Sequence, residues 1–153
     1  MIPLDETDRR ILRVLQSEGR LTNQELGDRV GLSSTPVWRR VKRMEDAGVI
    51  LGYGARVSPT ALGLSETVFV NVTLEHHTRD VQDRFAAEVV KLPEVQSADF
   101  LTGGSDFLLR VVVAGTEAYY DLLVERLYKL PGVKEVRSSF SLRTVKDSRA
   151  LPL

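Results

Sequence analysis

The chain has 153 residues, enough for one domain or two small ones, and 42% of them are hydrophobic. It contains no cysteine, which excludes disulfides, thiolate metal sites and a cysteine nucleophile. No apolar run approaches the roughly 18 residues that a membrane-spanning helix needs, and no secretory leader precedes Leu4. These features predict a cytoplasmic protein without a membrane partner.

Charge is balanced over the whole chain, with 21 basic and 21 acidic side chains. Residues 1–54 hold nine of the basic and eight of the acidic ones, so positive charge is concentrated in one helix rather than spread. A single copy should therefore bind nucleic acid weakly, and several copies acting together are expected.

The pattern of residues 21–51 is typical of a helix-turn-helix. Thr22 and Glu25 fit a capping box that begins a short helix. Gly31 supplies the left-handed residue of the turn before the next helix. Together with an amphipathic helix predicted over residues 5–16, this motif predicts a three-helix unit.

The second helix of the motif begins after Ser33, and its apolar stripe is Val37, Val41 and Met44. A helix presented in this way enters the major groove of DNA, with its first residues at base edges and other cations at phosphates. The competing interpretation is a solvated charged face, and an exposed Trp38 among cations argues against it. The predicted base-edge residues are Ser34, Thr35, Trp38 and Arg39, and the predicted phosphate contacts are Arg40, Lys42 and Arg43.

The remainder of the chain contains an internal repeat, because KLPEV at 91–95 returns as KLPGV at 129–133. Each repeat has the pattern strand, helix, Leu-Pro stop, strand. The predicted strands are 66–75, 95–102, 106–114 and 134–145, and the predicted helices are 79–91 and 117–129.

Two such units in succession give βαββαβ, a ferredoxin-like domain with both helices on one face of a four-stranded antiparallel sheet. The predicted fold class is therefore α+β, with a DNA-binding domain at 1–52, a linker strand at 53–64 and the ferredoxin-like domain at 65–153. The second face of the sheet carries Phe69 and several aliphatic side chains, so we expect a second copy to cover it and form a homodimer.

The whole chain resembles the Lrp/AsnC family of transcription regulators. The motifs that carry the resemblance are LDETDRRILRVLQ at the N-terminus, GLSSTP at the start of the second helix of the motif, and KLPGV before the last strand. The resemblance implies an N-terminal winged helix-turn-helix that binds double-stranded DNA. It also implies a C-terminal domain that forms dimers, assembles them into octamers and binds a small amino-acid effector between dimers.

In that family the effector lies at the loop that joins the second and third strands. The family's pattern in this loop resembles Gly-(Asp/Glu)-(Tyr/Phe)-Asp. Gly103 and Asp106 match this pattern, whereas Gly104 and Ser105 depart from it. Paired glycines let backbone N–H groups approach a carboxylate, and Asp106 accepts from an ammonium group. The alternative is a plain hairpin turn. The predicted effector-binding residues are Thr102, Gly103, Gly104, Ser105 and Asp106.

Four details resemble the branch of the family that controls cysteine degradation: Trp38, the pair His76-His77, the run Ser138-Ser139-Phe140 and the final Leu-Pro-Leu. This branch implies a small, sulfur-bearing effector.

The other signals do not predict chemistry. His76 and His77 are adjacent, so they point in different directions, and no metal site is expected. No serine has a positioned histidine base, so we expect neither catalysis nor a cofactor. Two other functions stay open: a nucleoid-associated protein that organises DNA with little sequence preference, and an amino-acid-binding enzyme or allosteric module that carries a helical domain.

Overall fold

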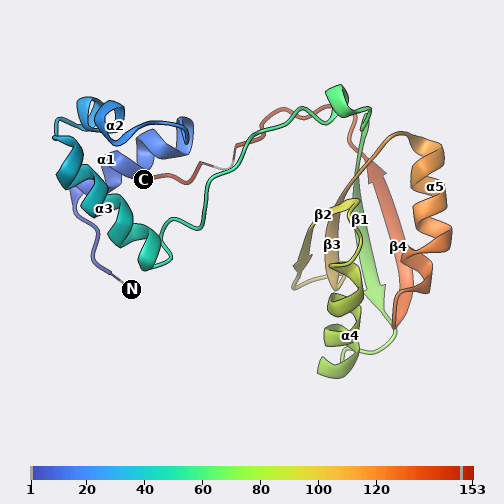
Figure 1. Ribbon diagram of the computed structural model, residues 1–153. Coiled ribbons are helices and arrows are strands. Elements are labelled where there is room, and N and C mark those ends of the chain that lie inside the picture. Colours follow the sequence, from blue (N-terminus) through green and yellow to red (C-terminus); the bar gives the residue numbers. More distant parts are fainter. Residues whose placement is uncertain (1, 149) are drawn as a thin grey trace. The chain divides into compact units, whose positions relative to one another are not determined.

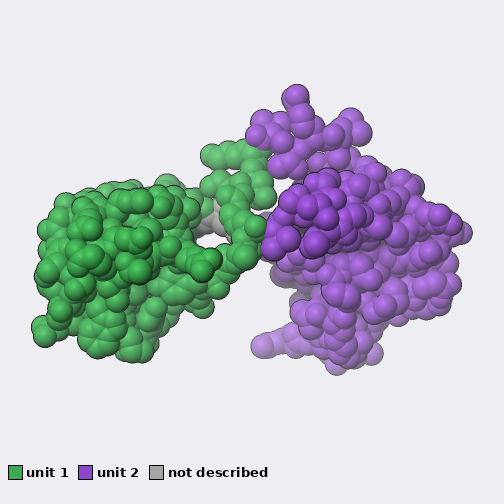
Figure 2. Space-filling model, turned by 45° about the horizontal axis from the view of Figure 1, so that its top comes forward, with its two compact units in different colours: residues 1–56, 146–153 green, residues 57–145 purple. Residues whose placement is uncertain are grey.

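The computed structural model describes residues 2–148 and 150–153. They form two compact units, which Figure 2 shows in different colours. Unit 1 comprises residues 1–56 and 146–153, and unit 2 comprises residues 57–145.

The described residues of unit 1 form the helices α1 (Glu6–Ser17), α2 (Asn23–Val30) and α3 (Ser34–Asp46) (Figure 1). The predicted capping box is confirmed: the Thr22 hydroxyl accepts from the N–H of Glu25, and the Glu25 carboxylate accepts from the N–H of Thr22. Ser33 precedes α3 as predicted, but its side chain makes no capping hydrogen bond. The buried apolar side chains of the unit are Ile11, Leu12, Leu26, Val30, Val37 and Met44.

The corner between α2 and α3 depends on two glycines. Gly31 ends α2 with φ 73°, the left-handed conformation that the sequence predicted. Gly27 faces the corner, where its carbonyl accepts from Leu32 N–H at 3.0 Å. A Cβ added at Gly27 would lie 2.4 Å from the Leu32 carbonyl oxygen, so only glycine lets α2 approach the turn this closely.

Residues 146–153, which the sequence-based boundary of 65–153 placed with the second domain, contact unit 1 in the structure. The side-chain amide of Gln16 accepts from Leu151 N–H at 2.5 Å and donates to the Leu151 carbonyl at 3.3 Å. Arg13 Nε donates to the Leu153 carbonyl at 2.9 Å. Local sequence patterns do not predict such contacts between residues that are far apart in the chain.

The predicted linker strand at 53–64 is wrong, because no strand occurs in these described residues. They contain only a 3-10 turn at Thr60–Leu62. Pro59 has no N–H to give to a ladder, and glycines interrupt the extended stretch before it.

Unit 2 has the predicted βαββαβ order. Its strands are β1 (Glu66–Leu74), β2 (Val95–Phe100), β3 (Phe107–Val113) and β4 (Val133–Phe140), and its helices are α4 (Arg79–Val89) and α5 (Thr116–Glu125). A 3-10 turn at Leu127–Lys129 follows α5. The sheet order is β2-β3-β1-β4 with antiparallel neighbours, which confirms the α+β, ferredoxin-like prediction.

The core of unit 2 lies between one face of the sheet and the two helices. Alternate residues of β1, from Val68 to Leu74, are buried against α4 and α5. Phe69 lies on the opposite face and is 38% exposed. β4 stops at Phe140, five residues earlier than predicted; Phe140 pairs with Val68, and one further backbone hydrogen bond, from Ser141 N–H to the Thr67 carbonyl at 2.9 Å, follows it.

Candidate functional site

The outer face of α3 is presented to solvent as the sequence predicted. Val37 and Met44 are fully buried and fix the rotation of the helix. Trp38, the only tryptophan, is therefore 53% exposed. Thr35, Arg39, Lys42 and Arg43 are also exposed, whereas Ser34 and Arg40 are half-buried.

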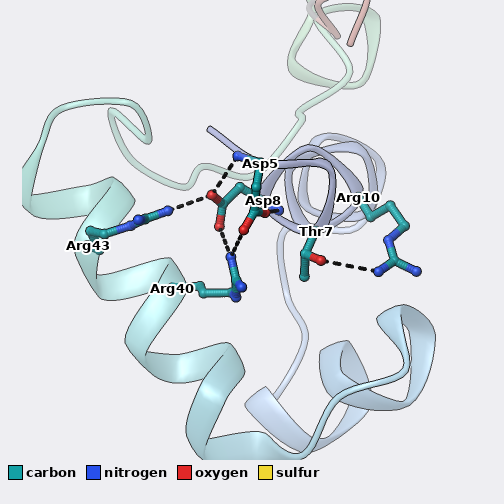
Figure 3. Close-up of polar contacts among 6 residues, drawn as sticks. All are labelled: Asp5, Thr7, Asp8, Arg10, Arg40 and Arg43. Carbon is teal, nitrogen blue, oxygen red and sulfur yellow. Dashed lines mark hydrogen bonds and ion pairs between the residues drawn. The ribbon is translucent and has the colours of Figure 1, made fainter. Parts of the chain in front are cut away.

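Two of the four cations of α3 are ion-paired with a buried carboxylate. Asp8, at the start of α1, is fully buried. Its Oδ1 lies 2.8 Å from Arg40 Nη1, and its Oδ2 lies 2.5 Å from Arg43 Nη2 (Figure 3). Because a buried charge needs partners, this cluster ties α1 to α3.

Asp5 completes the cluster at the N-terminus of α1. Its carboxylate accepts from Asp8 N–H at 2.8 Å, and Asp8 accepts from Asp5 N–H at 3.1 Å, a second capping box. Arg40 Nη1 also lies 2.7 Å from Asp5 Oδ2. The hydrogen bond from Asp8 N–H, and then that from Arg40, lower the pKa of Asp5. The bonds to Asp5 and then Asp8 raise the pKa of Arg40, so both groups stay charged.

The other two cations of α3, Lys42 and Arg39, differ in their ion pairing. Lys42 Nζ lies 2.6 Å from Asp46 Oδ1 in an exposed pair one turn along α3, and this hydrogen bond raises the pKa of Lys42. Arg39 takes part in none of the ion pairs among the described residues. Arg39 is thus the cation of the cluster that is most available to a partner.

A groove beside α3 is closed by a residue that the sequence analysis did not single out. Tyr53 donates to Glu45 Oε1 at 3.0 Å, and its ring lies against Gly19, where an added Cβ would be 3.7 Å from Tyr53 Cδ1. Burial, and then the hydrogen bond to Glu45, raise the pKa of Tyr53 to about 12. The groove is lined by Leu15, Leu21, Leu26, Trp38, Val41 and Tyr53 among others.

The predicted effector loop connects β2 to β3 and has an open tip. Thr102, Gly103 and Gly104 are exposed, and a Cβ at either glycine would meet nothing within 4 Å. Gly103 has φ +129°, which favours glycine. Ser105 is half-buried, and its hydroxyl donates to Asn71 Oδ1 at 3.1 Å.

Asp106 is a buried acceptor at the base of this loop, 9% exposed. Its Oδ2 accepts from Leu74 N–H at 2.7 Å, and its Oδ1 lies 2.8 Å from His77 Nδ1. Its own N–H donates to the Val72 carbonyl at 2.9 Å. The structure therefore brings Asp106 together with the end of β1, a contact that the sequence analysis missed. The only available signal was the antiparallel pairing of β1 with β3.

In the described part of the chain, no three His, Asp or Glu side chains gather as a metal site would require. Among the same residues, no helix is both long and apolar enough to cross a membrane.

Both units match known protein families. Residues 4–50 match a winged helix-turn-helix DNA-binding family, and residues 67–151 match the Lrp/AsnC ligand binding domain. The chain belongs to the Lrp/AsnC family of transcription regulators. As an Lrp/AsnC regulator, it has a helix-turn-helix DNA-binding domain in unit 1 and a ligand-binding domain in unit 2.

Relatives of this Lrp/AsnC regulator match over almost all of its length. The leucine-responsive regulatory protein of Salmonella typhimurium is 45% identical over 148 residues, 97% of this chain and 90% of that protein. The Bkd operon transcriptional regulator of Pseudomonas aeruginosa is 42% identical over 153 residues, 100% of both. A transcriptional regulator of Neisseria meningitidis, solved in complex with L-Met, has a TM-score of 0.94 and 41% identity, covering 98% of this chain and 97% of that one.

Proposed function

We propose that this regulator reads specific DNA sites with the N-terminal half of α3, and that Arg39 is its main base-reading cation. The observation that carries this proposal is the division of charge on the helix. Arg40 and Arg43 are held by Asp8, whereas Arg39 is exposed and outside the ion pairs of the described residues. Arginine recognises guanine through two parallel hydrogen bonds, and such a pair contributes about 1–3 kcal/mol of discrimination.

Two variants test the division of roles. Arg39→Ala should weaken binding to a selected operator by roughly 5- to 150-fold and random DNA much less. Lys42→Ala should weaken both DNAs and reduce the salt slope of log K by about 1. Fluorescence anisotropy across a salt series measures both quantities. Equal losses on the two DNAs for Arg39→Ala would assign Arg39 to phosphate, as the sequence analysis assigned Lys42, Arg40 and Arg43.

Footprinting separates a sequence-specific regulator from an organiser of the nucleoid. The regulator predicts protected sites that recur every ~10 bp or a multiple of it and share a palindrome. Uniform coverage of unrelated DNA would support the organiser instead. Because its target is genomic DNA, the proposal also places the protein in the cytoplasm.

We further propose that a small amino acid binds at the loop of residues 102–106 and modulates DNA binding or assembly. Asp106 has acceptor capacity for an ammonium group, and the exposed N–H groups around Gly103 and Gly104 suit a carboxylate. The Ser105 hydroxyl already donates to Asn71, so its part is smaller than that of Asp106. The relative solved with L-Met supports an amino acid, and L-Met also fits the sulfur-bearing effector that the cysteine-degradation branch implies.

A thermal-shift screen of the full chain against the twenty amino acids tests this effector proposal, since a ligand raises stability by RT ln(1 + [L]/Kd). Asp106→Asn should abolish the shift given by the amino acid that binds most tightly, whereas Asp99→Asn, on exposed β2, should preserve it. An unchanged shift in Asp106→Asn would remove this carboxylate from the site.

Assembly into homodimers, and of dimers into octamers, is the last part of the proposal. It is supported by the weak charge surplus of residues 1–54 and by Phe69, which is 38% exposed on the sheet face away from the helices. Phe69→Lys should reduce the sedimentation coefficient of the protein. The same coefficient as the wild type would place the interface elsewhere.

A further inference from the structure

Two groups of the chain itself hold the carboxylate of Asp106, one at each oxygen. Leu74 N–H donates to Oδ2, and His77 Nδ1 lies 2.8 Å from Oδ1. A carboxylate offers about four lone-pair positions, so two hydrogen bonds fix its orientation and leave acceptor capacity free.

His77 is well placed to act on Asp106 without being part of the sheet. It follows the end of β1. Its side chain is 68% exposed, and the ring contacts Asp106 through Nδ1. The His77 carbonyl accepts from Gln82 Nε2 at 3.5 Å, and the next residue, Thr78, stands at the N-cap position of α4 without a side-chain capping hydrogen bond. His77 therefore contacts the effector loop through its ring and the first turn of α4 through its backbone carbonyl.

A histidine at this position can bind the Asp106 carboxylate without adding the permanent positive charge that a lysine or arginine would add. In the tautomer with hydrogen on Nδ1, a neutral imidazole donates to the carboxylate without cancelling its negative charge. The charge of Asp106 then remains available to attract an ammonium group. A permanent cation in the same place would compete with that group for the carboxylate.

We propose that His77 is a positioning residue of the effector site: it holds the Asp106 carboxylate in the orientation that receives the α-ammonium group of an amino acid. This inference rests on the proposed effector function of the loop. It assigns to His77 a role in ligand affinity, with His76 as its natural control, since His76 is exposed and makes no hydrogen bond or ion pair among the described residues.

Three variants of the full-length protein test this role. The probe is the amino acid that gives the wild type its largest thermal shift in the panel of twenty, and its affinity is measured by calorimetry. His77→Ala should weaken binding by about tenfold, the effect of losing one hydrogen bond to a charged group. His77→Asn should restore affinity to within about threefold of the wild type, because its amide N–H occupies the place of Nδ1–H. His76→Ala should bind like the wild type.

The outcomes separate this inference from the effector proposal. Wild-type affinity in His77→Ala would overturn the positioning role alone. Equal weakness of His77→Ala and His77→Asn would also overturn it, because the hydrogen bond would then not be the cause. If no amino acid shifts the wild type, the effector proposal fails before any variant is compared, and the role of His77 falls with it.

Discussion

Replacing Asp8 by asparagine tests the ion-pair cluster that joins α1 to α3. The substitution keeps the shape of the side chain but removes the negative charge between Arg40 and Arg43, and it turns an N–H group toward one of them. It also weakens the bond that Asp8 accepts from Asp5 N–H. We expect unit 1, and not unit 2, to lose stability.

The size of the effect follows from burial. Removing one partner of a fully buried pair costs about 3–5 kcal/mol. Asp8 is fully buried, but the side chains of Arg40 and Arg43 are 31% and 46% exposed, so water can solvate the guanidinium groups that remain. We therefore expect the free energy of unfolding of unit 1 to fall by roughly 2–3 kcal/mol, a large part of the ~3–9 kcal/mol that is typical of a unit of this size.

Urea denaturation of the full chain, followed by Trp38 fluorescence, measures this loss. Trp38 is the only tryptophan and lies in α3, so its signal reports on unit 1. With a slope of about 1 kcal/mol per molar urea, the midpoint should fall by roughly 2–3 M. Asp46→Asn is the matched control, because it removes a carboxylate of the same unit that is 61% exposed and, among the described residues, forms an ion pair with Lys42 alone. If the two variants had the same midpoint, the buried cluster would not stabilise the unit.

Two further predictions concern the same unit. Gly27→Ala should destabilise it by about 1–3 kcal/mol, although alanine is the better helix former by about 1 kcal/mol, because the new Cβ meets the Leu32 carbonyl oxygen at 2.4 Å. Gly54→Ala, which has open space, is its control in the same urea assay, and a stability gain in Gly27→Ala would contradict the close approach. Burial and the hydrogen bond to Glu45 raise the pKa of Tyr53 from 10.0 to about 12, so this side chain favours folding below pH 10 and loses that contribution as the pH rises through 12. Tyr53→Phe should therefore lose less stability than the wild type between pH 10 and pH 12, and parallel alkaline profiles would show that Tyr53 ionises normally.

Local patterns predicted the elements of this fold well, because their determinants are short-range. The capping box of Thr22 and Glu25 and the left-handed turn at Gly31 depend on neighbours within four residues. The 38-residue repeat fixed the order of strands and helices, and the pattern of buried residues in β1 follows from alternation alone. The class and topology of both units were therefore accessible from the sequence.

Contacts between elements that are distant in the chain could not be predicted from local sequence patterns. Helical periodicity put Arg40 at the flank of α3, but the identity of its partners depends on how α1 packs, 32 and 35 residues earlier. The link between His77 and Asp106 spans 29 residues and requires the register of β1 against β3. In both cases the sequence showed which side chains are charged or polar, and only the packing showed which of them contact one another. On α3, those contacts neutralise much of the positive charge.

That neutralisation changes what the cation cluster on α3 means for DNA binding. Its four basic side chains, Arg39, Arg40, Lys42 and Arg43, lie beside three carboxylates of Asp5, Asp8 and Asp46, which leaves a surplus of one positive charge. The same surplus of one holds for all of residues 1–54. Since non-specific affinity depends on the number of phosphates neutralised, one copy of this helix is a weak ligand for DNA. The ion pairs of Arg40 and Arg43 with Asp8 are better suited to fixing α3 against α1, and affinity has to come from several such helices acting on one DNA molecule.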